Sequence, residues 1–439
     1  MMLLSEHFTY KKIIRFTLPS IIMMIFTSIY GIVDGFFVSN FAGKTAFAAL
    51  NLIMPFLMIC GCVGFMFGTG GAALVSKTLG EQEHDRANRI FTMIVTVSAV
   101  LGVIIAVAGF IFIRPIARLM GADGELLEYS VLYGRIILTA LPFYILQCEF
   151  QSLCVAAEKP KLGLYITIIS GCTNMVLDWA LTKSFGLAGA AAATAVSQFA
   201  GGIIPVMYFV LSKKSVLRFC RFGLDIKTLL KVCANGSSEF LSNISASFIS
   251  MLYNLQLMKY AGENGISAYG VLMYVSFVFQ AIFFGYAVGI TPVIGYHFGA
   301  KNKDELRGLL KKSLVIVLSC SAVMFVLGET MAYPFTSLFV GYDETLLDIT
   351  LHAFKIFSFS FLLSGFSVFG SAFFTSLNDG LTSAMISFLR TLVFQTAAII
   401  VFPLIWEIDG IWFSIVAAEI MAAAVTLLFL LIKRKKYGY

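Results

Sequence analysis

The chain has 439 residues, of which 59% are hydrophobic and only 13% are charged. Soluble domains carry about 25% charged residues, so this composition excludes a soluble globular protein and predicts a multi-pass membrane protein. The net charge of +7 would suit a nucleic-acid partner, but the charges are placed as in a membrane protein, and we expect no binding to nucleic acid.

Twelve apolar segments follow one another along the chain, each long enough to cross a bilayer as a helix. They cover about residues 13–38, 48–75, 91–113, 129–156, 162–182, 187–211, 232–258, 266–296, 313–334, 347–376, 383–404 and 409–432. The first is too long for a secretory signal and lacks a small-x-small cleavage site, so we expect it to remain as a helix. The prediction is an all-α protein with twelve transmembrane helices.

Most of the 31 lysine and arginine residues lie in alternate loops and at the two ends of the chain. Basic loops face the cytoplasm. We therefore expect both termini to be cytoplasmic, in a protein of the inner (plasma) membrane.

The two halves of the chain repeat each other. Short matches recur at a nearly constant offset of half the chain, pairing 41–43 with 260–262, 79–81 with 298–300, and 187–189 with 408–410. Six helices are thus followed by six of the same orientation, and we predict an N-terminal lobe (1–211), a basic cytoplasmic linker (212–231) and a C-terminal lobe (232–439). Parallel repeats of this kind are typical of transporters that work by alternating access, although a channel or a receptor can also be duplicated.

Two aspartates, Asp34 and Asp178, lie inside apolar segments. A carboxylate in hydrocarbon costs about 2.5–3.5 kcal/mol on insertion scales, so it normally faces a cavity and has a function. Both segments run outward, which brings the two acids to a similar depth in the N-terminal lobe. The repeat aligns them with Tyr253 and about Ile399, so the second half lacks both acids.

Three other oxygen-bearing side chains are expected at the same depth. Asn174 lies one helical turn before Asp178 on the same face, while Tyr133 and Thr194 enter their segments from the same side. Such a group can bind a proton, or hold Na+ through Asp34, Asn174 and Asp178, because hard cations prefer oxygen ligands. For the three neutral residues, hydrogen bonds that only join helices are an equally good interpretation.

Charged residues in the second half form a lower-ranked group. Glu239, Arg390 and Glu419 are predicted to line a C-terminal cavity that attracts cationic cargo, or else to form structural ion pairs. Pro19 removes a backbone hydrogen bond in the first helix and permits a bend below Asp34.

Nothing in the sequence indicates an enzyme or a bound cofactor. The four histidines have no metal-ligand spacing, the glycine run at Gly68 precedes no phosphate-binding pattern, and the eight cysteines are expected to be buried free thiols. The only expected bound ion is the coupling ion, H+ or Na+.

Several of these stretches resemble the multidrug and toxic compound extrusion (MATE) family, of the bacterial type within the MOP flippase superfamily. The resemblance rests on Thr17 to Gly43, the NMVLD motif ending at Asp178, the run Gly186 to Thr194, and the LG and FG loops after the second and eighth helices. It covers essentially the whole chain and implies two six-helix lobes.

In function, the resemblance implies efflux of cationic or amphipathic organic compounds in exchange for inward H+ or Na+. Asp34, Asn174 and Asp178 match the family's N-lobe ion-coupling residues, and Tyr133 and Thr194 match them more loosely. A second cation site known in one branch is not expected here, because Glu239 lies too early in its helix and the tenth helix has only Asp348, at its outer end.

The closest alternative is a flippase for a lipid-linked cell-envelope precursor, which would need several cavity arginines where this chain offers Arg390 and Arg135. An intramembrane hydrolase using Asp34 and Asp178 is less favoured, since both acids belong to one lobe. A monomer suffices for the transport mechanism. The identity of the cargo and the choice between H+ and Na+ stay open.

Overall fold

A computed structural model describes residues 3–212, 215–341 and 343–439, and every regular element within them is helical. The first half contains α1 (Tyr10–Phe41), α2 (Lys44–Gly80), α3 (His84–Leu119), α4 (Gly124–Ala156), α5 (Pro160–Leu177), the π-helical turn η1 (Asp178–Thr182) and α6 (Lys183–Leu211). The second half contains α7 (Ile226–Gly299), α8 (Lys303–Thr330), α9 (Ala332–Val340), α10 (Glu344–Ser358), α11 (Phe361–Ser376), α12 (Gly380–Phe388), the π-helical turn η2 (Leu389–Phe394), α13 (Gln395–Val401) and α14 (Pro403–Tyr437).

The helices of the described ranges give twelve membrane crossings. Nine helical runs in the described residues are long and apolar enough to span a bilayer, and α10 and α11 together form one more, bent by 48°. Two of the nine runs, of 52 and 74 residues, would be roughly 80 and 110 Å long, far more than the bilayer core of about 30 Å. Each reverses at a glycine with positive φ, Gly186 and Gly262, so each makes two crossings. The predicted all-α fold with twelve transmembrane helices is confirmed.

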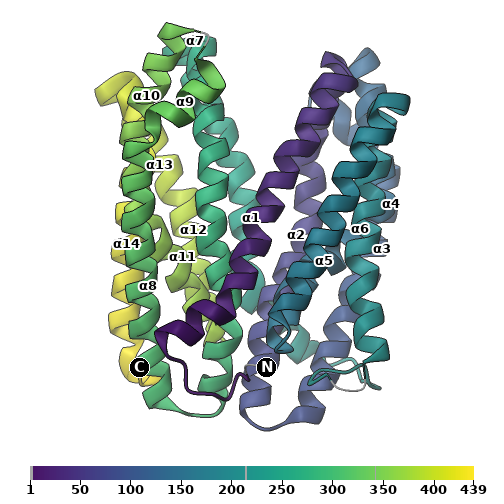
Figure 1. The fold of residues 1–439 in the computed structure, drawn as a ribbon, viewed down its shortest axis with the longest axis vertical. Helices are drawn as coiled ribbons and strands as arrows, with labels where there is room; N and C mark the ends of the chain where they lie inside the picture. Colours follow the sequence, from purple (N-terminus) through teal and green to yellow (C-terminus); the bar gives the residue numbers. More distant parts are fainter. Residues whose placement is uncertain (1–2, 213–214, 342) are drawn as a thin grey trace.

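The helices form two groups that approach each other at one end and diverge at the other (Figure 1). One group is α1–α6, here the N-lobe, and the other is α7–α14, here the C-lobe. Both chain ends lie at the closed end of this arrangement, which we call the terminal face. The opposite end, where the helices diverge and α7 turns, is the far face.

The two lobes share their backbone irregularities as well as their helix order. Residues with positive φ recur at equivalent places in the two halves: Gly43 with Gly262, Gln82 with Lys301, Glu158 with Asn378, and Gly186 with Glu407. All four pairs have nearly the same spacing as the sequence matches, so the repeat seen in the sequence is a repeat of structure.

The lobes contact each other through glycines of α2 and α7, in the part of each helix that lies toward the terminal face. A Cβ atom on Gly80 would collide with the Tyr296 carbonyl oxygen, and one on Gly299 would collide with that of Lys77. These two contacts are equivalent under the repeat, so they surround the pseudo-twofold axis. Backbone-to-backbone packing of small residues is how membrane helices approach most closely.

Gly236 of α7 provides a test of this contact. Its Cβ would collide with the Met66 carbonyl oxygen, a clash that the backbone cannot avoid without moving the lobes apart. We expect Gly236→Ala to lower the free energy of unfolding by about 1–3 kcal/mol, the usual cost of overpacking. Gly270→Ala, in the same helix with nothing within 4 Å, is the control and should leave thermal stability in detergent unchanged. Equal stability of the two variants would contradict the proposed role of the contact.

Several boundaries differ from the sequence prediction. Helix α7 begins at Ile226, so the last residues of the predicted linker (212–231) are helical, capped by the Asp225 carboxylate that accepts from the amides of Lys227 and Thr228. Lys213 and Lys214 of the linker lie outside the described residues. The linker also packs on α3, where Phe219 contacts Phe91.

Two further expectations were incomplete. The tenth apolar segment is bent between α10 and α11, and the short helix α9 before it was not predicted. The eight cysteines are free, but only four are buried, while Cys172 and Cys220 are exposed. Cys220 lies in the linker, outside the apolar segments, so the hydropathy of the sequence could not show whether it is buried.

Candidate functional site

Four helices of the N-lobe bring the predicted polar residues together. Asp34 of α1 accepts a hydrogen bond from the Thr194 hydroxyl of α6 at 3.5 Å. The Thr194 oxygen accepts in turn from the Asn174 side-chain amide of α5 at 3.3 Å. Tyr133 of α4 lies beside Thr194 and close to both aspartates.

Asp178 faces Asp34 inside this cluster. Its side chain is completely buried, and neither carboxyl oxygen receives a hydrogen bond within the described part of the chain. The Asp34 and Asp178 carboxyl groups interact directly with each other. Two ionised carboxylates cannot remain in contact in a low-dielectric site unless a proton or a cation lies between them.

The cluster has unused acceptors that suit such an ion. Both Asp178 oxygens, the Asn174 side-chain oxygen and the Tyr133 hydroxyl are buried without a hydrogen-bond partner among the described residues. All are oxygens, the ligand type that hard cations prefer. The donor set therefore fits either a shared proton or Na+. No group of three His, Cys, Asp or Glu side chains within the described ranges is arranged to bind another metal.

Asp178 also begins the π-helical turn η1, a feature that the sequence analysis did not predict. Its amide donates to the carbonyls of both Asn174 and Met175, and the π-helical turn begins at the acid itself. Asn174 and Asp178 still lie on one face, as their spacing indicated. Single π-turns are frequent at functional sites.

The equivalent place in the C-lobe is neutral and closed. Tyr253, which replaces Asp34, shares a hydrogen bond of 2.7 Å with Ser414 and stacks on Tyr269 at 4.9 Å between ring centroids. Ile399, which replaces Asp178, is buried. This position has satisfied polar groups and no charge, so only the N-lobe carries the carboxyl pair.

The three charged residues of the C-lobe divide into a pair and a single acid. Arg390 of η2 binds Glu419 of α14 through two guanidinium nitrogens at 2.8 to 3.0 Å, and both side chains are largely buried. Glu239 of α7 is half-buried. It lies close enough to interact electrostatically with Arg390 and with Cys62 of α2 in the other lobe. Arg390 and Glu419 thus form an ion pair, while Glu239 lies near the boundary between the lobes.

Pro19 lies in α1 where that helix packs on α7. Its neighbours Thr17 and Ser20 pack against Gly289 and Gly285 of α7, respectively. Helix α1 is bent near its start (Figure 1). The bend that Pro19 permits is therefore next to the lobe contact.

One buried acid lies apart from all these groups. Glu149 of α4 accepts a hydrogen bond from Ser98, and its second oxygen has no partner in the described residues. Glu149 is not among the functional residues that the sequence predicts.

A family model named MatE matches residues 19–180 and 240–401. The chain belongs to the MatE family. One matched range lies in each lobe, in agreement with the repeat, and the resemblance to MATE transporters is confirmed. The protein is therefore a multi-pass membrane transporter of this family.

Curated relatives and solved structures agree with this assignment. The chain is 25% identical to "Multidrug export protein MepA" of Staphylococcus aureus (strain MRSA252) over 430 residues, 97% of this chain and 94% of the relative. It is also 25% identical to the protein of that name from Staphylococcus haemolyticus (strain JCSC1435), over 95% of this chain and 92% of the relative. An outward-facing structure of a multidrug resistance MATE family transporter of the MOP superfamily superposes with a TM-score of 0.93 at 22% identity, over 98% of this chain and 97% of that one. A likeness at that identity establishes the fold alone.

Proposed function

We propose that this protein is a secondary active antiporter that exports cationic or amphipathic organic compounds in exchange for inward H+ or Na+. The observation that carries the proposal is the buried carboxyl pair Asp34–Asp178, which has unsatisfied oxygens and no counterpart at the equivalent place in the other lobe. The relatives named for multidrug export support the export of drug-like compounds.

The ion acts on the packing of the N-lobe. With a proton or Na+ at Asp34, Asn174 and Asp178, the repulsion between the carboxyl groups is removed and α1, α5 and α6 can pack together. When the ion leaves, the same groups repel each other, and α1 is free to bend at Pro19. Binding thus biases a two-state bundle, which is the requirement for coupling. Tyr133 and Thr194 orient the aspartates.

The arrangement of the lobes supports alternating access. The glycine contacts join them in the terminal half, while the helices diverge toward the far face (Figure 1). We assign this conformation as open to the outside, with both termini and the basic linker (212–231) in the cytoplasm between lobes 1–211 and 232–439. On this proposal the protein acts as a monomer in the inner membrane and has no enzymatic activity.

The flippase alternative depends on arginines that would bind pyrophosphate. Arg390 is already neutralised by Glu419, and Arg135 is exposed above the Phe110 ring at 5.0 Å. Neither is placed to bind an anionic headgroup between the lobes, so we do not propose this function.

Efflux of ethidium from inside-out vesicles tests the antiporter proposal. A pH gradient and a sodium gradient are imposed separately, because the donor set accepts either ion. We expect saturable dye transport that follows one gradient and stops when it is dissipated. Dye movement that is equal with and without both gradients would contradict antiport and identify a passive pathway.

Glu239 is the acid that we assign to cargo recognition. It has no bidentate partner among the described residues, and it lies near the lobe boundary, where a cationic compound would be carried. We expect Glu239→Gln to raise the KM for ethidium about tenfold, the effect of losing about 1.4 kcal/mol of binding. The KM for an uncharged amphipathic cargo should change less than twofold. An equal change for both cargoes would show that Glu239 does not recognise charge.

A further inference from the structure

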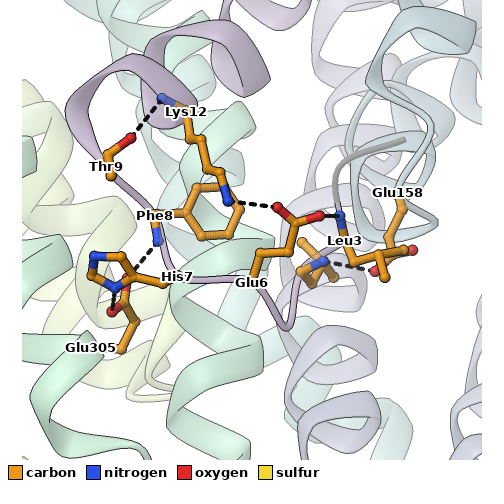
Figure 2. Close-up of polar contacts among 9 residues, drawn as sticks. Leu3, Glu6, His7, Phe8, Thr9, Lys12, Glu158 and Glu305 are labelled. Carbon is orange, nitrogen blue, oxygen red and sulfur yellow. Dashed lines mark hydrogen bonds and ion pairs between the residues drawn. The ribbon is translucent and has the colours of Figure 1, made fainter.

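The segment before α1 crosses from one lobe to the other at the terminal face. Figure 2 shows residues 3–8 between Glu158, in the turn after α4 of the N-lobe, and Glu305, in the first turn of α8 of the C-lobe. The segment is not helical, and its contacts to the lobes are made by both backbone and side-chain groups.

The contact with the N-lobe is a hydrogen bond. The Leu4 amide donates to Glu158 Oε1 at 2.7 Å, and the Leu4 side chain is fully buried in a cluster that contains Val155 of α4 and many C-lobe residues. Burial raises the pKa of the Glu158 carboxyl, and the Leu4 amide offsets part of the cost of keeping it ionised.

The contact with the C-lobe involves more groups. Glu305 accepts from the Phe8 amide at 2.9 Å and interacts with His7 Nδ1 at 2.5 Å, while Lys312 Nζ donates to the Phe8 carbonyl at 2.5 Å. The buried Phe8 ring packs edge-on against His297 of α7, with 6.3 Å between centroids. Glu305, Lys312 and His297 of the C-lobe thus hold the backbone and the ring of a single residue, Phe8.

An internal bridge keeps the segment in shape between these contacts. Glu6 accepts from the Leu3 amide at 3.1 Å and from Lys12 Nζ at 2.8 Å (Figure 2). The hydrogen bond from Lys12 lowers the pKa of Glu6, so Glu6 is ionised at neutral pH. The bridge ties the segment to the start of α1, the helix that carries Asp34.

The linker makes a comparable contact on the other lobe. The amide of Arg218 donates to Asn88 Oδ1 at 2.9 Å, and Phe219 packs on Phe91 of α3 at 5.1 Å between centroids. Helix α3 is the third helix of the N-lobe, as α8 is the third crossing of the C-lobe. Each lobe is therefore preceded by a segment that docks on the opposite lobe, but the linker is joined covalently to a lobe at both ends, whereas residues 3–8 precede the first helix.

We propose that residues 3–8 form a clasp that holds the lobes together at the terminal face and releases when that face opens. The opening is a step of the transport cycle, so in this respect the inference rests on the proposed function. The contacts join groups on both lobes, and they can persist only while Glu158 and Glu305 keep their present separation. The clasp favours the conformation described here.

A buried reporter cysteine measures opening without measuring transport. Ser76 of α2 is fully buried opposite Gly295 of α7, where the lobes meet. Ser76→Cys is introduced into a background in which the exposed Cys172 and Cys220 are serine. Cys233 and Cys320, which are partly exposed, are serine as well. The reaction of the thiol introduced at position 76 with a membrane-impermeant maleimide is followed in inside-out vesicles. Size-exclusion chromatography verifies that each variant is folded.

We expect labelling at position 76 to be at least about fivefold faster in a variant lacking residues 2–8 and in Glu158→Ala, because each loses hydrogen bonds to a charged group. The matched control is Glu83→Gln, which removes an acid of the same face that forms an ion pair with Arg86 of its own lobe, and it should label at the original rate. Unchanged labelling in the two clasp variants, or equal acceleration in the control, would overturn the clasp. Because labelling needs no cargo or gradient, a failure of the antiporter proposal leaves this result interpretable.

Discussion

Asp34→Asn and Asp178→Asn are each expected to abolish gradient-driven export of ethidium. One pH unit is worth about 1.4 kcal/mol per proton, so a coupled exporter sustains up to about a tenfold dye gradient per proton exchanged. A variant that cannot exchange the ion should sustain none. The measurement is the steady-state ratio of dye concentrations inside and outside vesicles that carry equal amounts of wild-type protein or variant. The imposed pH gradient is about one unit.

The same substitutions should not destabilise the fold. Asparagine has the shape of aspartate, and removing one of two facing carboxylates relieves repulsion, so thermal stability in detergent should be equal or higher. Asp348→Asn is the control, because this acid is exposed near the start of α10 and its loss should leave export unchanged. Full export in both Asp34→Asn and Asp178→Asn would contradict a coupling role for the pair.

Glu419→Gln is expected to lower the free energy of unfolding by about 3–5 kcal/mol, because it leaves the Arg390 guanidinium buried without its partner. Arg390→Met should have a similar effect. The double variant Arg390→Met with Glu419→Leu should recover most of the loss, since an apolar pair of similar volume is often as stable as a buried ion pair.

A double-mutant cycle measured by thermal unfolding in detergent tests this structural role. We expect a coupling energy of about 2 kcal/mol or more between the two positions. Glu239→Gln provides the contrast, since Glu239 has no bidentate partner in the described part of the chain and its loss should affect cargo binding more than stability. Additive effects of the two single substitutions would show that Arg390 and Glu419 do not act as a pair.

Features set by composition and local pattern could be predicted from the sequence. Long apolar runs, basic loops and the repeat between the two halves led to twelve helices in two lobes. Asp34 and Asp178 were identifiable because a carboxylate in an apolar segment is rare. Their convergence with Asn174 followed from helical spacing and from the common direction of the first and fifth helices.

Features that depend on tertiary contacts could not be predicted in this way. The π-turn at Asp178 and the bend between α10 and α11 involve no unusual residues, and apolar sequence alone does not distinguish them from straight helix. For Arg390 and Glu419 the sequence left cargo binding and ion pairing equally open, and only their distance of 2.8 Å in space identifies a pair. The clasp joins His7 to Glu305, from opposite ends of the chain, which no local pattern reveals.

The most direct test of the central claim is to follow ion and cargo together in proteoliposomes that contain only this protein. An internal pH indicator or sodium indicator is recorded while ethidium is added on one side, with no other gradient imposed. We expect dye entry to be accompanied by exit of H+ or Na+, in a fixed ratio, and both fluxes to be absent in Asp178→Asn. Dye entry without movement of either ion, or ion movement that persists in Asp178→Asn, would contradict this expectation.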